Sequence, residues 1–148
     1  MEISKAEKED LPEILALQYL AYQSEAELFE NKDIPPLKQT LEELAEEFDS
    51  GVILKLTDDN AIIGSVRANC NGKTTYIGKL MVHPSYRGQG LGSRLLLEIE
   101  SYFPDTRYEL FTSTRSASNI RLYRKIGYEI FDQKEMDDEL IFIYMQKL

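Results

Sequence analysis

A glycine-rich turn between an apolar strand and an apolar-periodic helix is the feature that most limits how this chain can fold. Gly88, Gly90 and Gly92 occupy alternate positions, after an apolar segment at 76–82 and before a helical pattern that starts near Leu91. Glycine lacks Cβ, so it allows positive φ and lets a ligand approach the main chain. The first N–H groups of a helix are unpaired and lie at the positive end of its dipole. The turn therefore predicts a phosphate or diphosphate site.

Two familiar phosphate-binding loops do not match this turn. A P-loop requires G-x-x-x-x-G-K-[ST], whereas Gly78-Lys79 is followed by Leu80. A dinucleotide fingerprint requires G-x-G-x-x-G, and residues 88–93 have a different spacing. A turn of this kind can also serve only to connect a strand to a helix. The strand before it, the helix after it and the flanking Arg87, a permanent cation suited to bidentate phosphate contact, favour the anion site.

Two blocks of the sequence resemble the GNAT superfamily of N-acetyltransferases. Residues 87–92 fit the family's diphosphate signature Q/R-x-x-G-x-G/A at every fixed position, and residues 80–84 resemble the strand that leads into that loop. Residues 119–128 resemble the family's later helix, with the pattern N…Y-x-x-x-G-[FY]. The resemblance covers residues 50–148 well and is weaker before residue 50.

Periodicity and turn signals place the elements of an α/β or α+β domain with a mixed sheet, which we expect to span residues 1–148 as one unit. Helices are expected from about 11 into the twenties and at 40–48, 91–103 and 116–125. Strands are expected at 3–5, 52–56, 61–69, 74–82, 107–112, 128–131 and 140–145. The GNAT resemblance implies a mixed, largely antiparallel sheet that is splayed open after Val82, holds the cofactor in that opening, and is flanked by about four helices.

Local signals fix several element ends. Asp10 with Glu13 and Thr40 with Glu43 each match a capping box at a helix start. Gly51 and Gly127 are expected to end helices. The pair Pro35-Pro36 is expected to exclude helix, and turns are expected at 58–60, at Asn71-Gly72 and around Asp137-Asp138.

Charge is unevenly distributed along a chain whose net charge is −9. Residues 1–50 hold 14 acidic and 4 basic residues, residues 51–131 hold 7 and 11, and residues 132–148 hold 5 and 2. The acidic total argues against nucleic acid as a partner. The basic middle, which contains both GNAT-like blocks, favours an anionic cofactor such as coenzyme A.

Further features bear on compartment and partners. Cys70 is the single cysteine, which suits a reducing compartment, and its apolar surroundings indicate a structural thiol. The N-terminus has no apolar signal region, and no apolar run is long enough to span a bilayer. We therefore expect a cytoplasmic protein with no membrane partner. The sequence leaves the oligomeric state open, a homodimer included.

The resemblance implies roles for individual residues in acetyl transfer from acetyl-CoA, without a metal and without a covalent enzyme intermediate. Main-chain groups at Met81 and Val82 would hold the pantetheine arm and the acetyl carbonyl. Asn119 would bind the cofactor, and Tyr123 would be the general acid that protonates the leaving thiolate; a phenol with a pKa near ~10 is a suitable donor. The main-chain N–H groups that would hold the diphosphate belong to Arg87, Gly88, Gln89, Gly90, Leu91 and Gly92.

The general base is not identified by the resemblance. Many family members carry a Glu on the strand before the diphosphate loop, but residues 76–82 contain no acid. Glu25, Glu30 and Glu109 are candidates that would act through water. His83 is the only histidine, and its place at a strand-to-loop junction indicates a structural role.

The acidic ends of the chain suggest a cationic acceptor amine: a polyamine, an amino sugar, or a lysine or N-terminal amine. Solvated acidic helix faces would produce the same composition. The leading hypothesis is an acetyl-CoA-dependent N-acetyltransferase that acts by direct transfer to a primary amine in a ternary complex. The alternative is a non-catalytic acyl-CoA-binding sensor, which the missing strand Glu favours and the retained tyrosine disfavours. A nucleotide-phosphate enzyme is disfavoured because both nucleotide loops are absent.

Overall fold

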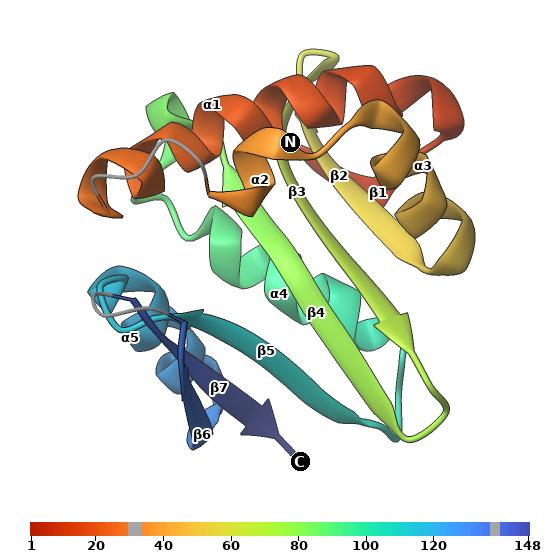
Figure 1. The fold of residues 1–148 in the computed structure, drawn as a ribbon. Helices are drawn as coiled ribbons and strands as arrows, with labels where there is room; N and C mark the ends of the chain where they lie inside the picture. The colour runs from red at the N-terminus through yellow and green to blue at the C-terminus, as the bar shows by residue number, and fades with distance from the viewer. Residues whose placement is uncertain (30–33, 137–139) are drawn as a thin grey trace.

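One seven-stranded sheet organises the chain, in the order β1-β2-β3-β4-β5-β7-β6 (Figure 1). The computed structural model describes residues 1–29, 34–136 and 140–148. Neighbouring strands pair antiparallel except β4 and β5, which are parallel. The mixed, largely antiparallel sheet that we expected is therefore confirmed. The strands are β1 (Glu2–Lys5), β2 (Val52–Asp58), β3 (Ala61–Cys70), β4 (Thr74–Val82), β5 (Arg107–Ser113), β6 (Glu129–Glu135) and β7 (Ile141–Lys147).

Helices cover both faces of this sheet, and within the described ranges four of them have ten or more residues. They are α1 (Leu11–Phe29), α3 (Leu41–Ser50), α4 (Leu91–Ser101) and α5 (Ala117–Ile126), with a short α2 (Pro35–Lys38) and two 3-10 turns, η1 (Lys8–Asp10) and η2 (Pro84–Tyr86). Helices α1 and α3 lie toward the viewer at the top of Figure 1, and α4 lies behind β3 and β4.

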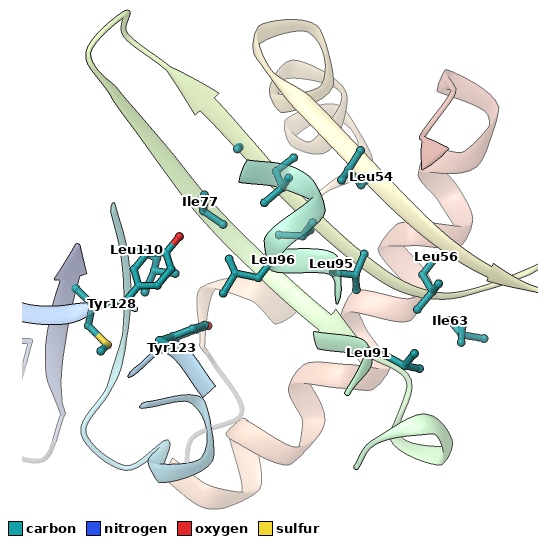
Figure 2. Packing of buried hydrophobic residues seen from close by; sticks show 14 of the residues in the cluster. Leu54, Leu56, Ile63, Ile77, Leu91, Leu95, Leu96, Leu110, Tyr123 and Tyr128 are labelled. Atoms are coloured by element: carbon teal, nitrogen blue, oxygen red, sulfur yellow. The ribbon is translucent and has the colours of Figure 1, made fainter. Parts of the chain in front are cut away.

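Alternation along the strands separates two buried clusters. Ile53 of β2 packs with α1 and α3, whereas its neighbour Leu54 packs with α4 on the other face. Successive side chains of a strand point to opposite faces, so a strand covered on both sides is buried at consecutive positions. The larger cluster joins α4 to β5 and α5 through Leu96, Leu110 and Tyr123 (Figure 2).

The sheet is splayed between its two parallel strands. β4 pairs with β5 only from Thr74, opposite Arg107, to Tyr76, opposite Glu109. Beyond that point the two strands diverge in Figure 1. Residues 77–82 therefore have β3 on one side and no strand partner on the β5 side within the described residues. This is the opening that the GNAT resemblance implied.

A β-bulge in β4 changes which face its later residues occupy. Ser65 pairs with Met81 and Arg67 with Gly78, so two residues of β4 stand opposite one of β3, and Lys79 has a φ of 52°. Before the bulge, Ile77 packs toward α4; after it, Met81 packs with α1. One inserted residue reverses the alternation of a strand.

Helix α1 begins at Leu11 as expected, but the predicted capping box at its start and the predicted absence of helix at Pro35-Pro36 were wrong. The carboxylate of Asp10 accepts from the N–H of Glu7 at 2.8 Å, so the cap closes the 3-10 turn η1, three residues earlier than expected. Glu13 instead accepts from the N–H of Ile62 at 2.8 Å and fastens α1 to β3. The prolines at 35–36 begin a helix, because the first helical positions need no N–H donor and favour the φ of proline.

The other local signals agree with the structure where it describes them. The Thr40–Glu43 capping box is present in both directions, at 2.9 and 3.2 Å. Gly72 adopts a φ of 99° in the expected hairpin turn, and Gly127 ends α5 with a φ of 113°. Residues 31–33 and the turn at Asp137-Asp138 lie outside the described residues.

Candidate cofactor and catalytic site

The loop from β4 to α4 is held by contacts at both of its ends. The N–H of His83 donates to the carbonyl of Ile63 at 2.7 Å, and its Nδ1 accepts from the N–H of Ser85 at 3.0 Å. The hydroxyl of Tyr86 donates to Asp58 at 2.9 Å, and that hydrogen bond with the nearby carboxylate charge raises the pKa of Tyr86. His83 therefore caps the turn η2, in agreement with the structural role expected of it.

The three glycines of the turn serve two different purposes. Gly88 and Gly90 have φ values of 80° and 77°, the left-handed region, and a Cβ on either would meet open space. Their exposed main chain can be approached closely by a ligand. Gly92 is different, because a Cβ there would lie 3.3 Å from Leu122 of α5. Gly92 therefore allows α4 to pack closely on α5.

The side chain of Arg87, for which the sequence predicts a phosphate contact, bonds to α1 in this structure. Its guanidinium donates to the Ser24 hydroxyl at 2.9 Å and to the carbonyl of Ala21 at 3.0 Å, both in α1. These bonds tie the loop to the second half of α1. The main-chain N–H of Arg87 remains part of the loop, beside exposed Gln89.

Met81 and Val82 lie at the end of β4 that borders the opening. Met81 is buried against α1 and pairs with Ser65, while half-buried Val82 pairs with Gly64 and packs toward α4. Because no strand adjoins β4 on the β5 side here within the described residues, an extended ligand could hydrogen-bond this edge as an added strand would.

The second sequence block brings two predicted site residues to one face of α5. Asn119 and Tyr123 are four residues apart, which places them on the same side of a helix. Asn119 donates to the Thr112 hydroxyl at 3.4 Å, at the end of β5. Tyr123 is buried in the cluster that contains Leu91, the first residue of α4. Figure 2 shows its ring beside Tyr128 and directed toward α4. The structure therefore joins both sequence blocks in one region.

Ser116, at the N-cap of α5, is a polar group that the sequence did not draw attention to. It is 5% exposed, and its Oγ has no hydrogen-bond partner among the described residues. A buried hydroxyl without a partner is uncommon in folded proteins. It precedes Asn119 by one helical turn, so the N-terminus of α5 is polar and close to the proposed cofactor contacts.

A carboxylate-centred cluster anchors the far end of this region. Buried Glu100 accepts from the Tyr128 hydroxyl at 2.8 Å and from the Lys147 ammonium at 2.8 Å. Burial and the Glu100 carboxylate raise the pKa of Tyr128 well above its ordinary value, so this phenol stays protonated. The cluster links α4, β7 and the second residue after α5. No local pattern predicted it, because its partners are distant in sequence.

A second polar cluster that the sequence did not predict fastens the helices above β3. The guanidinium of Arg67, which is 6% exposed, donates to Gln18, Gln39 and Glu47, the Gln39 bond being 3.2 Å. Gln18 in turn donates to the carbonyl of Pro36 at 2.8 Å. Buried charges are tolerated when paired in this way. The cluster positions α1, α2 and α3 on the face opposite Tyr123.

The structure narrows the candidates for a general base. Glu109 lies where β4 and β5 part, and its carboxylate is 2.8 Å from the guanidinium of Arg107. The Nδ1 of His83 is already an acceptor in the loop. Cys70 is half-buried at the hairpin, with its Sγ 3.3 Å from the N–H of Gly72. Glu30 and the side chain of Glu25 lie outside the described residues.

Comparison with known families agrees with this geometry. The family model described as the acetyltransferase (GNAT) family matches residues 11–128. The chain belongs to the GNAT acetyltransferase family. GNAT acetyltransferases are acyltransferases, and the match includes the turn at 87–92 and both residues of interest on α5.

Individual relatives of this GNAT protein were found by sequence and by fold. It is 29% identical to the uncharacterized protein YyaT of Bacillus subtilis (strain 168) over 92 residues, and that match spans 60% of either chain. Its fold resembles the PaiA N-acetyltransferase of Thermoplasma acidophilum in complex with coenzyme A, at 19% identity, a TM-score of 0.82, and 99% and 97% coverage. It also resembles yncA of Salmonella typhimurium, solved with acetyl-CoA, at 18% identity, a TM-score of 0.73, and 99% and 92% coverage. In the described residues no helix is long and apolar enough to cross a membrane.

Proposed function

We propose that this GNAT protein is an acetyl-CoA-dependent N-acetyltransferase that transfers the acetyl group directly to a primary amine in a ternary complex. The observation that carries the proposal is the convergence of three features at one opening. These are the unpaired edge of β4, the left-handed glycines before α4, and Tyr123 on α5. We further propose that residues 1–148 act as one catalytic domain, since all the strands from β1 to β7 belong to a single sheet.

The cofactor would use main-chain groups more than side chains. The diphosphate would accept hydrogen bonds from the N–H groups of residues 87–92, where the α4 dipole also favours a negative charge. The amide groups of pantetheine would pair with the β4 edge at Met81 and Val82, and Asn119 would contact the arm from α5. Acetyl-CoA supplies an activated thioester carbonyl to this site.

The chemistry that we propose breaks one bond and forms one bond. The lone pair of a neutral amine attacks the thioester carbonyl carbon, the new C–N bond forms, and the C–S bond breaks. The Tyr123 hydroxyl gives its proton to the departing thiolate of coenzyme A. The amine nitrogen loses a proton to water or to a carboxylate reached through water. Tyr123 then recovers a proton from solvent, so atoms and charge balance.

The acceptor that we propose is a primary amine on a cationic small molecule or a peptide. Support comes from the charge distribution, since residues 1–50 and 132–148 are acidic and the acceptor that we propose would approach beside them. Complementary charge raises the local concentration of a cationic substrate.

Substitution of Tyr123 tests the proposal when it is combined with a broad amine screen. Tyr123→Phe should lower kcat by about 100-fold or more and leave the Kd for acetyl-CoA within about twofold, because only a transition-state interaction is removed. Tyr128→Phe is the matched control: it is buried in the same cluster, with its ring centroid 6.1 Å from that of Tyr123. Equal losses of kcat and of cofactor affinity would remove Tyr123 from the acid role. If acetyl-CoA binds and no amine releases coenzyme A above background, the protein is instead an acyl-CoA sensor.

A further inference from the structure

Four aromatic side chains gather on the open face of the C-terminal half of the sheet. We call Phe111, Phe131, Phe142 and Tyr144 the aromatic face. The ring centroid of Phe111 lies 5.0 Å from that of Phe142 and 5.7 Å from that of Tyr144, and Phe131 lies 6.4 Å from Tyr144. The four rings come from β5, β6 and β7 and form one continuous surface.

This surface faces away from the hydrophobic core. Leu110, Ile143 and Met145, which alternate with the rings along β5 and β7, are buried in the cluster under α4 and α5. The rings therefore project from the opposite face, and Phe111 is 51% exposed. Figure 1 shows no helix over this side of β5, β7 and β6 among the described residues. A contiguous cluster of exposed aromatic side chains is a candidate for a ligand-binding surface.

The aromatic face borders the opening of the sheet. Glu109 is the last residue of β5 that pairs with β4, and Phe111 lies two residues farther, about 7 Å along the strand. Phe111 is therefore on the part of β5 that has separated from β4. A molecule lying on Phe111 and Tyr144 would have one end at the place where the proposed acetyl transfer occurs.

The size and charge of the surface favour a small molecule over a second protein. The exposed parts of Phe111 and Phe131 amount to roughly 200 Å², far below the roughly 800 Å² per partner of a standard interface. The outer strand β6 also presents Asp132, Lys134 and Glu135, and charged side chains discourage edge-to-edge pairing of strands.

Two of the charged side chains beside the rings compensate each other. Arg107 is 2.8 Å from Glu109 and its guanidinium lies 4.7 Å from the centroid of Phe131. Glu129 accepts from Gln146 at 3.4 Å. The rings therefore offer mainly apolar contact and the electron-rich face of an aromatic system to a ligand.

We infer that the acceptor is a small amine with an aromatic or bulky apolar body, which packs on the aromatic face while its amino group reaches the opening between β4 and β5. This inference rests on the proposed N-acetyltransferase function and specifies its substrate class. A hydrophilic polyamine or an amino sugar would leave the rings largely uncovered, so the aromatic face favours the arylalkylamine class over both.

The test compares 2-phenylethylamine with ethylamine, which differ only by the phenyl group. We expect kcat/KM to be at least about tenfold higher for 2-phenylethylamine. Phe111→Ala should remove most of this preference, measured as the ratio of the two kcat/KM values. Leu97→Ala is the matched control, because Leu97 is also 51% exposed but lies on α4. That variant should keep the preference unchanged.

Each outcome separates the inference from the function on which it rests. If no amine is acetylated, the proposed function fails. If amines are acetylated but the phenyl group gives no advantage, or Phe111→Ala keeps the advantage, the inference alone is wrong. Sedimentation velocity on the same variants completes the test: if the wild type is a dimer that Phe111→Ala converts to a monomer, the aromatic face is a subunit interface and the inference is overturned.

Discussion

Tyr128 donates its hydroxyl hydrogen to the buried carboxylate of Glu100 at 2.8 Å, across 28 residues of sequence. Tyr123, five residues earlier, lies in the same apolar cluster. The two phenols therefore share an environment but have different neighbours. One completes a carboxylate cluster, and the other faces the region that we propose for the leaving thiolate.

Tyr128→Phe should lower the free energy of unfolding by about 1–3 kcal/mol, because Glu100 loses a donor and stays buried. Activity per folded molecule should be within about twofold of wild type. Urea unfolding followed by circular dichroism measures the first quantity, and steady-state kinetics the second. A large fall in kcat with unchanged stability would place Tyr128, rather than Tyr123, in the reaction.

Gly88→Ala and Gly90→Ala should each weaken acetyl-CoA binding, since alanine at the observed φ values of 80° and 77° costs about 1–2 kcal/mol and moves the N–H groups of the loop. Isothermal titration calorimetry should show a Kd raised about tenfold or more. Gly72→Ala is the control, with a φ of 99° in the distant hairpin. It should lose similar stability and keep the wild-type Kd; an equal change of Kd in all three variants would show that the effect is only global.

Gly51→Ala should be one of the most destabilising single substitutions in the protein. A Cβ at this position would lie 2.3 Å from the carbonyl oxygen of Ala68, so β2 and β3 would have to move apart. We expect a loss of about 3 kcal/mol or more in the free energy of unfolding. Gly78→Ala is the comparison, since its Cβ would meet nothing within 4 Å. Thermal melts that show equal losses for the two would contradict this packing argument.

The Asp10–Lys55 ion pair should make stability depend on pH at both extremes. Burial opposes the Asp10 charge, but the 2.8 Å bond from Lys55 and the N–H of Glu7 outweigh it and lower the pKa of Asp10. The same bond raises the pKa of Lys55. A lowered Asp pKa gives stability that is present above about pH 4 and lost as the pH falls through the folded value. A raised Lys pKa gives stability that is present below about pH 10 and lost above it.

Asp10→Asn should therefore reduce the melting temperature at pH 7 by a few degrees, a loss of about 1 kcal/mol for a half-buried pair that water still reaches. The difference from wild type should shrink as the pH falls below about 4. Differential scanning calorimetry from pH 3 to pH 7 measures it. A difference that stays constant over this range would mean that the carboxylate charge contributes nothing.

The features that residue patterns alone predicted correctly, without the family resemblance, are local ones. The Thr40–Glu43 cap joins residues three apart, and the Asn71-Gly72 turn is closed by the Asn71 side chain, which accepts from two N–H groups within three residues. Signals of this kind are complete within a few positions. The helix that begins at Pro35 was not predicted, because proline disrupts the interior of a helix but favours its start.

The features that the sequence could not reveal depend on partners far along the chain. The guanidinium of Arg87 bonds to α1 at separations of 63 and 66 residues, so no local pattern could reveal these two contacts. The aromatic face likewise arises only when β5, β7 and β6 are placed side by side. The sequence predicts a phosphate contact for the N–H of Gly92, but the close approach of this residue to Leu122 becomes visible only once α4 and α5 are packed.

The extra residue at Lys79 acts as a change of phase in a two-residue repeat. Side chains of β4 up to Gly78 follow one alternation, and those from Leu80 onward follow the opposite one, so Met81 packs on the α1 face of the sheet instead of the α4 face. Deleting one residue at this point would keep Met81 and Val82 in the sequence and still exchange the faces of the sheet to which their side chains point. The exact number of residues in β4 therefore decides which side chains border the candidate active site.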